Sequence, residues 1–128
     1  MTAVERIHLS HGLVGFPDLT TFKVRPVEGP LVELVAEEAA EFGLLALPLE
    51  TVQPLARRRL EDLGQVGREE AVLVFLSLHG DPPQVTANLA GPLVVAPGGA
   101  ARQLVVEDPA FPLRLPLGPL AGAPTCSS

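Results

Sequence analysis

Short apolar runs bounded by glycine or proline recur along this chain, and they limit the folds that it can adopt. Ile7 and Leu9 alternate with polar residues, and Phe22 and Val24 do the same further along. A period of two with one polar face indicates a half-buried strand of an antiparallel sheet. The 12 Gly and 14 Pro of the sequence break the chain between such runs and favour short strands joined by turns.

The same patterns place the remaining elements. A helix is expected within residues 51–64, because Val52, Ala56, Leu60 and Leu63 recur at helical spacing. Pro97-Gly98-Gly99 is typical of a hairpin turn. Further strands are expected at residues 31–36, 41–47, 69–79, 84–90, 92–96 and 101–107. About eight short strands with one helix predict an all-β, mainly antiparallel fold: a small closed or partly open β-barrel with one short α-helix.

The chain length fits a single domain. With 128 residues, the chain is long enough to bury one core. We assign residues 1–117 to this domain. From Leu117 onward the residues are small, polar or helix- and strand-breaking, so residues 118–128 are expected to form a disordered tail.

Charge and cysteine content exclude several classes of function. The formal net charge is −6, which argues against binding to nucleic acid or to an anionic membrane. Cys126 is the only cysteine, so neither an intrachain disulfide nor a cysteine metal cluster is possible. The sequence starts without the pattern of a secretory signal and has no long uninterrupted apolar stretch. We therefore expect a cytoplasmic protein.

The residue types that bind metals are few and scattered. His8, His11, His79 and Asp81 form the one candidate set. Positions three apart on a strand point to opposite faces, so His8 and His11 would converge only where Gly12 bends the chain. We expect unrelated exposed histidines, with neither a metal nor another cofactor.

Two polar features have both a structural and a functional interpretation. Asn88 stands among aliphatic residues before the Gly91-Pro92 break. Its amide can lie on an exposed face, satisfy backbone groups near the break, or contact a partner. The acidic residues of segment 37–41 can form a solvated loop or a docking face for a basic partner.

Four segments in order resemble the family of flagellar assembly factors called FliW. They are GLVGFPDLTTFKV, ELVAEEAAEFGLLALP, VTANLAGPLVV and RQLVVEDPAFPLRLPL, at residues 12–24, 33–48, 85–95 and 102–117, with the expected helix between the second and third. The most specific part is the block from Asn88 to Pro92. The chain departs from the family pattern at several positions, including Val14, where the family usually has Pro, and Gly91, where it usually has Ala.

The resemblance implies a small antiparallel β-barrel that has no catalytic activity and works by binding proteins. FliW proteins bind flagellin, and they bind the translational repressor CsrA when flagellin has been exported, which relieves repression of flagellin synthesis. For the partner surface we single out Asn88, Leu89, Pro92, Phe42 and Glu41. Two alternatives remain: a β-barrel whose cavity holds a small apolar ligand, and a metal-dependent enzyme that uses the three histidines.

Overall fold

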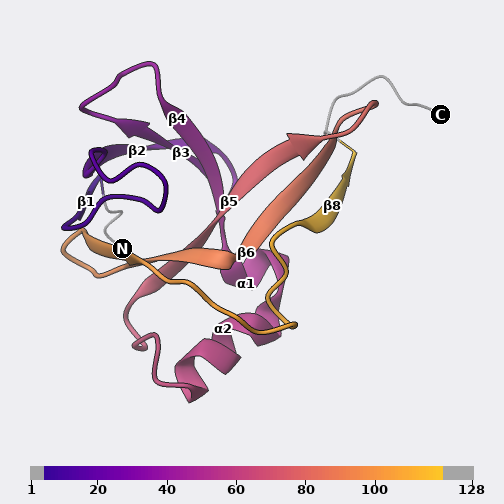
Figure 1. Cartoon of the computed structure of the whole chain (residues 1–128). Helices are drawn as coiled ribbons and strands as arrows, with labels where there is room; N and C mark the ends of the chain where they lie inside the picture. The colour runs from indigo at the N-terminus through magenta and orange to yellow at the C-terminus, as the bar shows by residue number, and fades with distance from the viewer. Residues whose placement is uncertain (1–4, 120–128) are drawn as a thin grey trace.

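The structure, a computed structural model, describes residues 5–119 and contains eight strands and two short helices (Figure 1). In chain order these are β1 (Arg6–Leu9), β2 (Thr21–Glu28), β3 (Leu31–Ala36), β4 (Gly43–Pro48), α1 (Leu49–Val52), α2 (Pro54–Asp62), β5 (Ala71–His79), β6 (Gln84–Val95), β7 (Ala100–Gln103) and β8 (Leu115–Pro119).

Seven of the strands close into a barrel. They lie in the order β5-β4-β3-β2-β1-β7-β6, and the pairing of β6 with β5 completes the ring. β1 and β7 are parallel, whereas the other pairs are antiparallel. β8 pairs with the first half of β6 outside the ring. The expected all-β, mainly antiparallel barrel is confirmed.

The core has two parts, which lie on the two faces of β5 and β6. Leu73 of β5 and Leu93 of β6 belong to the barrel interior, which side chains such as Phe22 fill. Val74 and Val94, one position further along each strand, face the second part, which the helices cover. A strand between two cores must be apolar on both faces, which is the pattern of residues 71–76 and 93–95. At about 25 cal/mol per Å² of buried apolar surface, this double burial makes β5 and β6 the energetic centre of the fold.

The expected helix is divided into two pieces. Gln53 separates α1 from α2 and is extended, with φ −149° and ψ 92°. The following Pro54 explains this, because proline disfavours helical geometry in the residue before it and suits the first helical position after it. Ala56 and Leu60 are buried as expected, but Leu63 lies past the end of α2 and is exposed.

Several other boundaries differ from the expectation. The strands expected at 84–90 and 92–96 form one strand, β6, because Gly91 and Pro92 make a bulge rather than a break. The strand expected at 101–107 ends at Gln103. The boundary expected at residue 117 lies inside β8, which runs to Pro119; residues 120–128 of the expected tail lie outside the described residues. The Pro97-Gly98-Gly99 hairpin turn is confirmed between β6 and β7, with Ala96 N donating to Ala100 O at 2.8 Å.

Candidate protein-binding groove

A large bulge interrupts the pairing of β6 with β5. Leu93 lies opposite Leu73, and Asn88 lies opposite Phe75. Residues 89–92 of β6 therefore have only Val74 facing them across the ladder. Extra residues in one strand lose their ladder partners and bend that strand, so their backbone groups need hydrogen bonds from elsewhere.

The Asn88 side chain supplies two of these hydrogen bonds. Its Oδ1 accepts from the backbone N–H of Ala90 at 2.9 Å and from that of Gly91 at 3.0 Å. This is the local side-chain-to-backbone geometry that asparagine forms in turns. Of the interpretations that the sequence left open, the satisfaction of backbone groups near the Gly91-Pro92 pair is therefore the one that the structure contains.

The segment that follows β7 supplies hydrogen bonds to the rest of the bulge. Leu104 N donates to Pro92 O at 2.9 Å, and Val106 N donates to Ala90 O at 2.8 Å. On the return of the chain, Leu89 N donates to Pro112 O at 2.9 Å. Residues 104–112 thus run along an irregular part of β6, which explains why this extended segment is not a continuation of β7.

Gln103 joins the bulge to the loop of residues 12–17. Its Nε2 donates to Gly91 O at 2.9 Å, and its Oε1 accepts from Val14 N at 2.8 Å. A Cβ on Gly91 would lie 3.0 Å from this Nε2, so glycine gives the amide room to approach. Gln103 was not predicted from the sequence. A polar residue just before an aliphatic run was the available signal.

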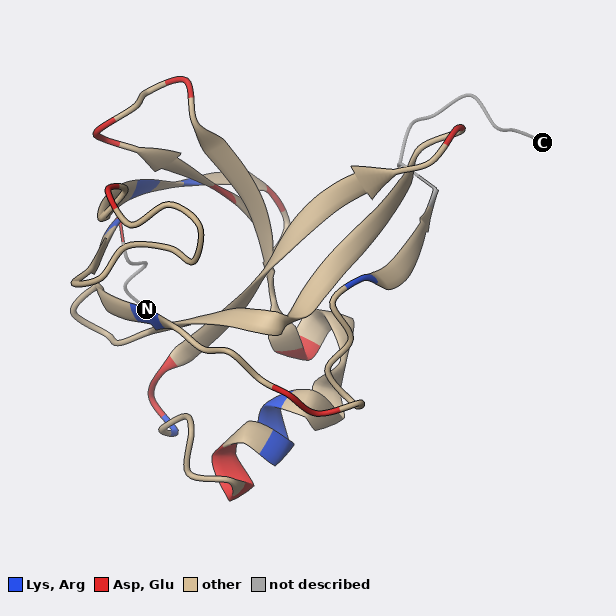
Figure 2. Ribbon diagram, in the orientation of Figure 1, with Lys and Arg blue, Asp and Glu red and all other residues tan. Residues whose placement is uncertain are grey.

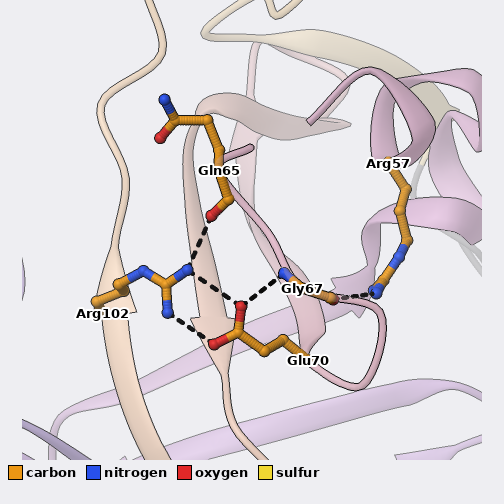
Figure 3. A network of polar contacts seen from close by, with 5 residues as sticks. All are labelled: Arg57, Gln65, Gly67, Glu70 and Arg102. Carbon is orange, nitrogen blue, oxygen red and sulfur yellow. Dashed lines mark hydrogen bonds and ion pairs between the residues drawn. The ribbon is translucent and has the colours of Figure 1, made fainter. Parts of the chain in front are cut away.

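The neighbouring Arg102 fixes β7 to the loop after α2 (Figure 3). Its Nη1 donates to Glu70 Oε2 at 2.8 Å and its Nη2 to Glu70 Oε1 at 3.1 Å. Nη2 also donates to Gln65 O at 2.8 Å, and Gly67 N donates to Glu70 Oε1 at 2.8 Å. The Arg102 guanidinium and the Gly67 N–H lower the pKa of Glu70 to about 2. Two-point arginine–carboxylate pairing of this kind gives geometric precision as well as energy.

A groove open to solvent lies above the bulge. It encloses about 250 Å³ and is lined by Val14, Asn88, Ala90, Gly91, Gln103, Leu104, Val105 and Leu113. Three of these side chains are apolar and strongly exposed: Val14 at 65%, Val105 at 70% and Leu113 at 60%. We call these residues the groove rim. Single exposed apolar side chains are common, but several around one hollow mark an interaction site.

The five residues singled out from the sequence fall in different environments. Asn88 lines the groove. Leu89 is fully buried in the core and Pro92 is buried in the bulge, where both contribute to the shape of the bulge. Phe42 is half-buried beside Phe16, and Glu41 is exposed in the same loop. The structure does not bring Glu41 or Phe42 into the groove lining, and the contact roles of all five stay predictions.

The histidines are not brought together. His8 lies on β1, where its Nδ1 is 3.2 Å from Thr21 Oγ1, and His79 lies at the end of β5. Within residues 5–119, no three His, Cys, Asp or Glu side chains are grouped so that they could hold a metal ion. None of the helices in this part of the chain is long and apolar enough to cross a membrane.

Comparison with known proteins gives a consistent result. The sequence model of the family described as FliW protein matches residues 1–117. The flagellar assembly factor FliW of Geotalea uraniireducens (strain Rf4) is 27% identical over 118 residues, which cover 86% of this chain and 72% of that protein. A crystal structure of the flagellar assembly factor FliW superposes with a TM-score of 0.73 at 20% identity, and covers 91% of this chain and 88% of the other. At 20% identity, the match to this crystal structure shows a similar fold alone.

Proposed function

Because the chain belongs to the FliW family, whose members are flagellar assembly factors rather than enzymes, we propose that it works in the cytoplasm by binding two proteins, flagellin and the regulator CsrA. Binding to CsrA would relieve repression of flagellin translation, and free flagellin would compete by occupying the same protein. Such a switch needs no catalysed reaction. It needs only that flagellin and CsrA compete for binding to the same protein.

The observation that carries this proposal is the groove rim. Val14 comes from the loop of residues 12–17, and Val105 and Leu113 come from the two ends of the connection between β7 and β8, yet all three are exposed around one hollow. Exposure of apolar side chains to water is unfavourable, so a partner that covers them on association gains free energy of binding. The floor is fixed by Asn88 and Gln103, so little ordering is needed when a partner binds.

The other candidate functions receive no comparable support. Side chains such as Phe22, Leu34 and Leu93 fill the barrel interior, where a small apolar ligand would have to lie. The formal charge of −6 opposes direct binding of nucleic acid or an anionic membrane. We therefore propose protein partners alone, without a cofactor.

The test is a binding measurement on three groove-rim variants, Val14→Ser, Val105→Ser and Leu113→Ser, by calorimetry with purified CsrA and with flagellin. Removal of a central apolar contact should weaken binding by about tenfold or more. Leu55→Ser and Leu78→Ser are matched controls, because both leucines are exposed and neither lines the groove. Failure of the unmodified protein to bind either partner at micromolar concentration would refute the function. Equal losses in rim and control variants would refute the site.

A further inference from the structure

The groove alone is small for a stable protein contact, so a partner must also touch its surroundings. A typical specific interface takes about 20–30 residues from each partner, whereas eight residues line the groove. The loop of residues 12–17 continues the exposed surface next to the groove, because Val14 lies on the groove rim and Phe16, two residues later, is also exposed. The surface around Phe16 is therefore the natural continuation of the contact.

This loop is built so that it exposes its apolar side chains. Gly12 has φ +69°, and a Cβ there would lie 2.4 Å from Pro17 O, so only glycine permits the tight turn. Leu13 and Phe16 exchange backbone hydrogen bonds of 3.2 and 2.9 Å across the loop. Leu13 is buried, whereas Val14 is 65% and Phe16 is 48% exposed. A rigid loop that turns a phenylalanine outward is costly in water unless the ring is covered in a complex.

Phe42 from the loop between β3 and β4 completes an aromatic pair. The ring centroids of Phe16 and Phe42 are 4.9 Å apart, and the rings are tilted by 57°. This lies within the range of favourable aromatic contacts. Phe42 also packs against the barrel core, so the pair is anchored on one side and open on the other. Aromatic rings of this kind are the usual anchors of protein interfaces.

The two loops that carry the pair contain Asp and Glu but neither Lys nor Arg, and Glu37 among them pairs with Arg6 of β1 at 2.6 Å. Asp18, Glu38 and Glu41 are exposed on the two loops that carry Phe16 and Phe42, and the sequence has neither Lys nor Arg in residues 7–22 or 26–56. The loop between β3 and β4, at the upper left of Figure 2, shows acidic positions without basic ones. Thr20 Oγ1 donates to Glu38 Oε2 at 2.7 Å and lowers the pKa of Glu38. Glu38 is therefore charged at neutral pH.

We propose that the Phe16–Phe42 pair and the acidic residues Asp18, Glu38 and Glu41 form a docking surface for a basic, amphipathic segment of a protein partner. The segment would place apolar side chains on the two rings and Lys or Arg against the carboxylates. Apolar contact would supply most of the affinity, and charge would raise the association rate and select the partner. The inference deepens the proposed function by stating the chemistry of the bound segment, and a peptide can test it without either partner.

The probe is a short fluorescein-labelled peptide made of Leu, Phe, Lys and Arg. Its binding is measured by fluorescence anisotropy and compared with that of a charge-reversed peptide, in which Glu replaces every Lys and Arg. The basic peptide should bind the full chain, more weakly as salt is added, and the acidic peptide should not. Phe16→Ala should weaken binding by about fivefold or more. Equal binding of both peptides, or unchanged affinity in Phe16→Ala with an unchanged melting curve, would overturn the proposal.

A charge-matched comparison separates the surface from the overall net charge. Two double variants change the net charge equally and alter exposed residues. The docking-surface pair is Asp18→Asn with Glu41→Gln, and the control pair is Glu28→Gln with Asp62→Asn. The docking-surface pair should weaken binding of the basic peptide by about fivefold, and the control pair should weaken it by less than about twofold. Equal losses would show non-specific attraction and refute the docking surface. If the chain binds the basic peptide but neither CsrA nor flagellin, the docking surface is supported and the proposed function is refuted.

Discussion

Asn88 folds back on its own strand and accepts a hydrogen bond of 3.0 Å from the backbone N–H of Gly91. The same oxygen accepts from Ala90, so one amide serves two N–H groups that the bulge removes from the ladder. Buried or half-buried N–H groups without a partner are costly, at about 1–3 kcal/mol each. A polar residue in an aliphatic strand is therefore what allows β6 to bend beneath the groove.

We expect Asn88→Ala to lower the free energy of unfolding by about 1–3 kcal/mol in total, because both N–H groups lose their acceptor and water in the open groove replaces it only in part. Asn88→Asp keeps an oxygen acceptor and should recover most of the loss. Urea unfolding of the three proteins measures the difference. Gln84→Ala is the control, since Gln84 is exposed on the same strand. If Asn88→Ala unfolds like the wild type but binds partners weakly, the residue acts mainly as a contact.

Much of the barrel could be predicted from the sequence, because each strand carries its own local signal. Alternation in residues 6–9 and 21–24 depends only on which face is buried, and Ile7, Leu9 and Phe22 are indeed buried. The apolar character of both faces of residues 71–76 fits the position of β5 between the two parts of the core. Pairing between distant strands, such as parallel β1 and β7, leaves no such local pattern.

The site was harder to predict because its parts meet only in the folded chain. Asn88 could be recognised as unusual, but its hydrogen bonds depend on a bulge that residue composition does not reveal. Val14 and Leu113 lie far apart in sequence and become neighbours of one groove through the bulge and through Gln103. Leu89 stands beside Asn88 in the most family-like segment, yet alternation along β6 turns its side chain into the core.

Burial of Leu89 predicts a division between stability and binding. Leu89→Ala removes a fully buried side chain and should cost about 2–5 kcal/mol of unfolding free energy. Leu113→Ala removes an exposed one and should change stability by less than about 0.5 kcal/mol. Thermal melts give the stability, and partner binding measured below the melting range gives the second readout. Loss of binding in a folded Leu89→Ala protein with an intact Leu113 would contradict this division.

Two glycines of the loop that carries Phe16 should respond differently to alanine. Gly12 and Gly15 both have positive φ, +69° and +88°, but only Gly12 has backbone, that of Pro17, in the space of a Cβ. We expect Gly15→Ala to cost about 1–2 kcal/mol for the left-handed conformation alone. Gly12→Ala should cost more, because the loop must also move. Unfolding curves measure the costs, and hydrogen exchange of Val14 N–H reports whether its bond to Gln103 survives; equal costs would show that the loop moves freely.

The pairing of Glu70 with Arg102 predicts an acid-sensitive part of the stability. The pKa of Glu70 is about 2 in the folded chain, against an ordinary value of 4.5. A carboxyl whose pKa is lowered by folding stabilises the fold fully above its unfolded pKa, and loses that contribution as the pH falls towards the folded value. The window is therefore from about pH 4.5 down to about pH 2. Because the Arg102 side chain is 49% exposed, solvent screening reduces the expected contribution to about 1–2 kcal/mol.

Glu70→Gln isolates this contribution. The variant should be less stable than the wild type at neutral pH, because Arg102 loses its charged partner, and the difference should shrink as the pH falls through the window. Other carboxyl groups titrate in both proteins, so their effects cancel in the difference. Glu69→Gln is the control, since Glu69 is exposed and forms no salt bridge in residues 5–119. Urea unfolding at several pH values gives the curves. Parallel curves for wild type and Glu70→Gln would mean that Arg102 holds the loop through Gln65 O alone, so that the carboxylate charge contributes nothing.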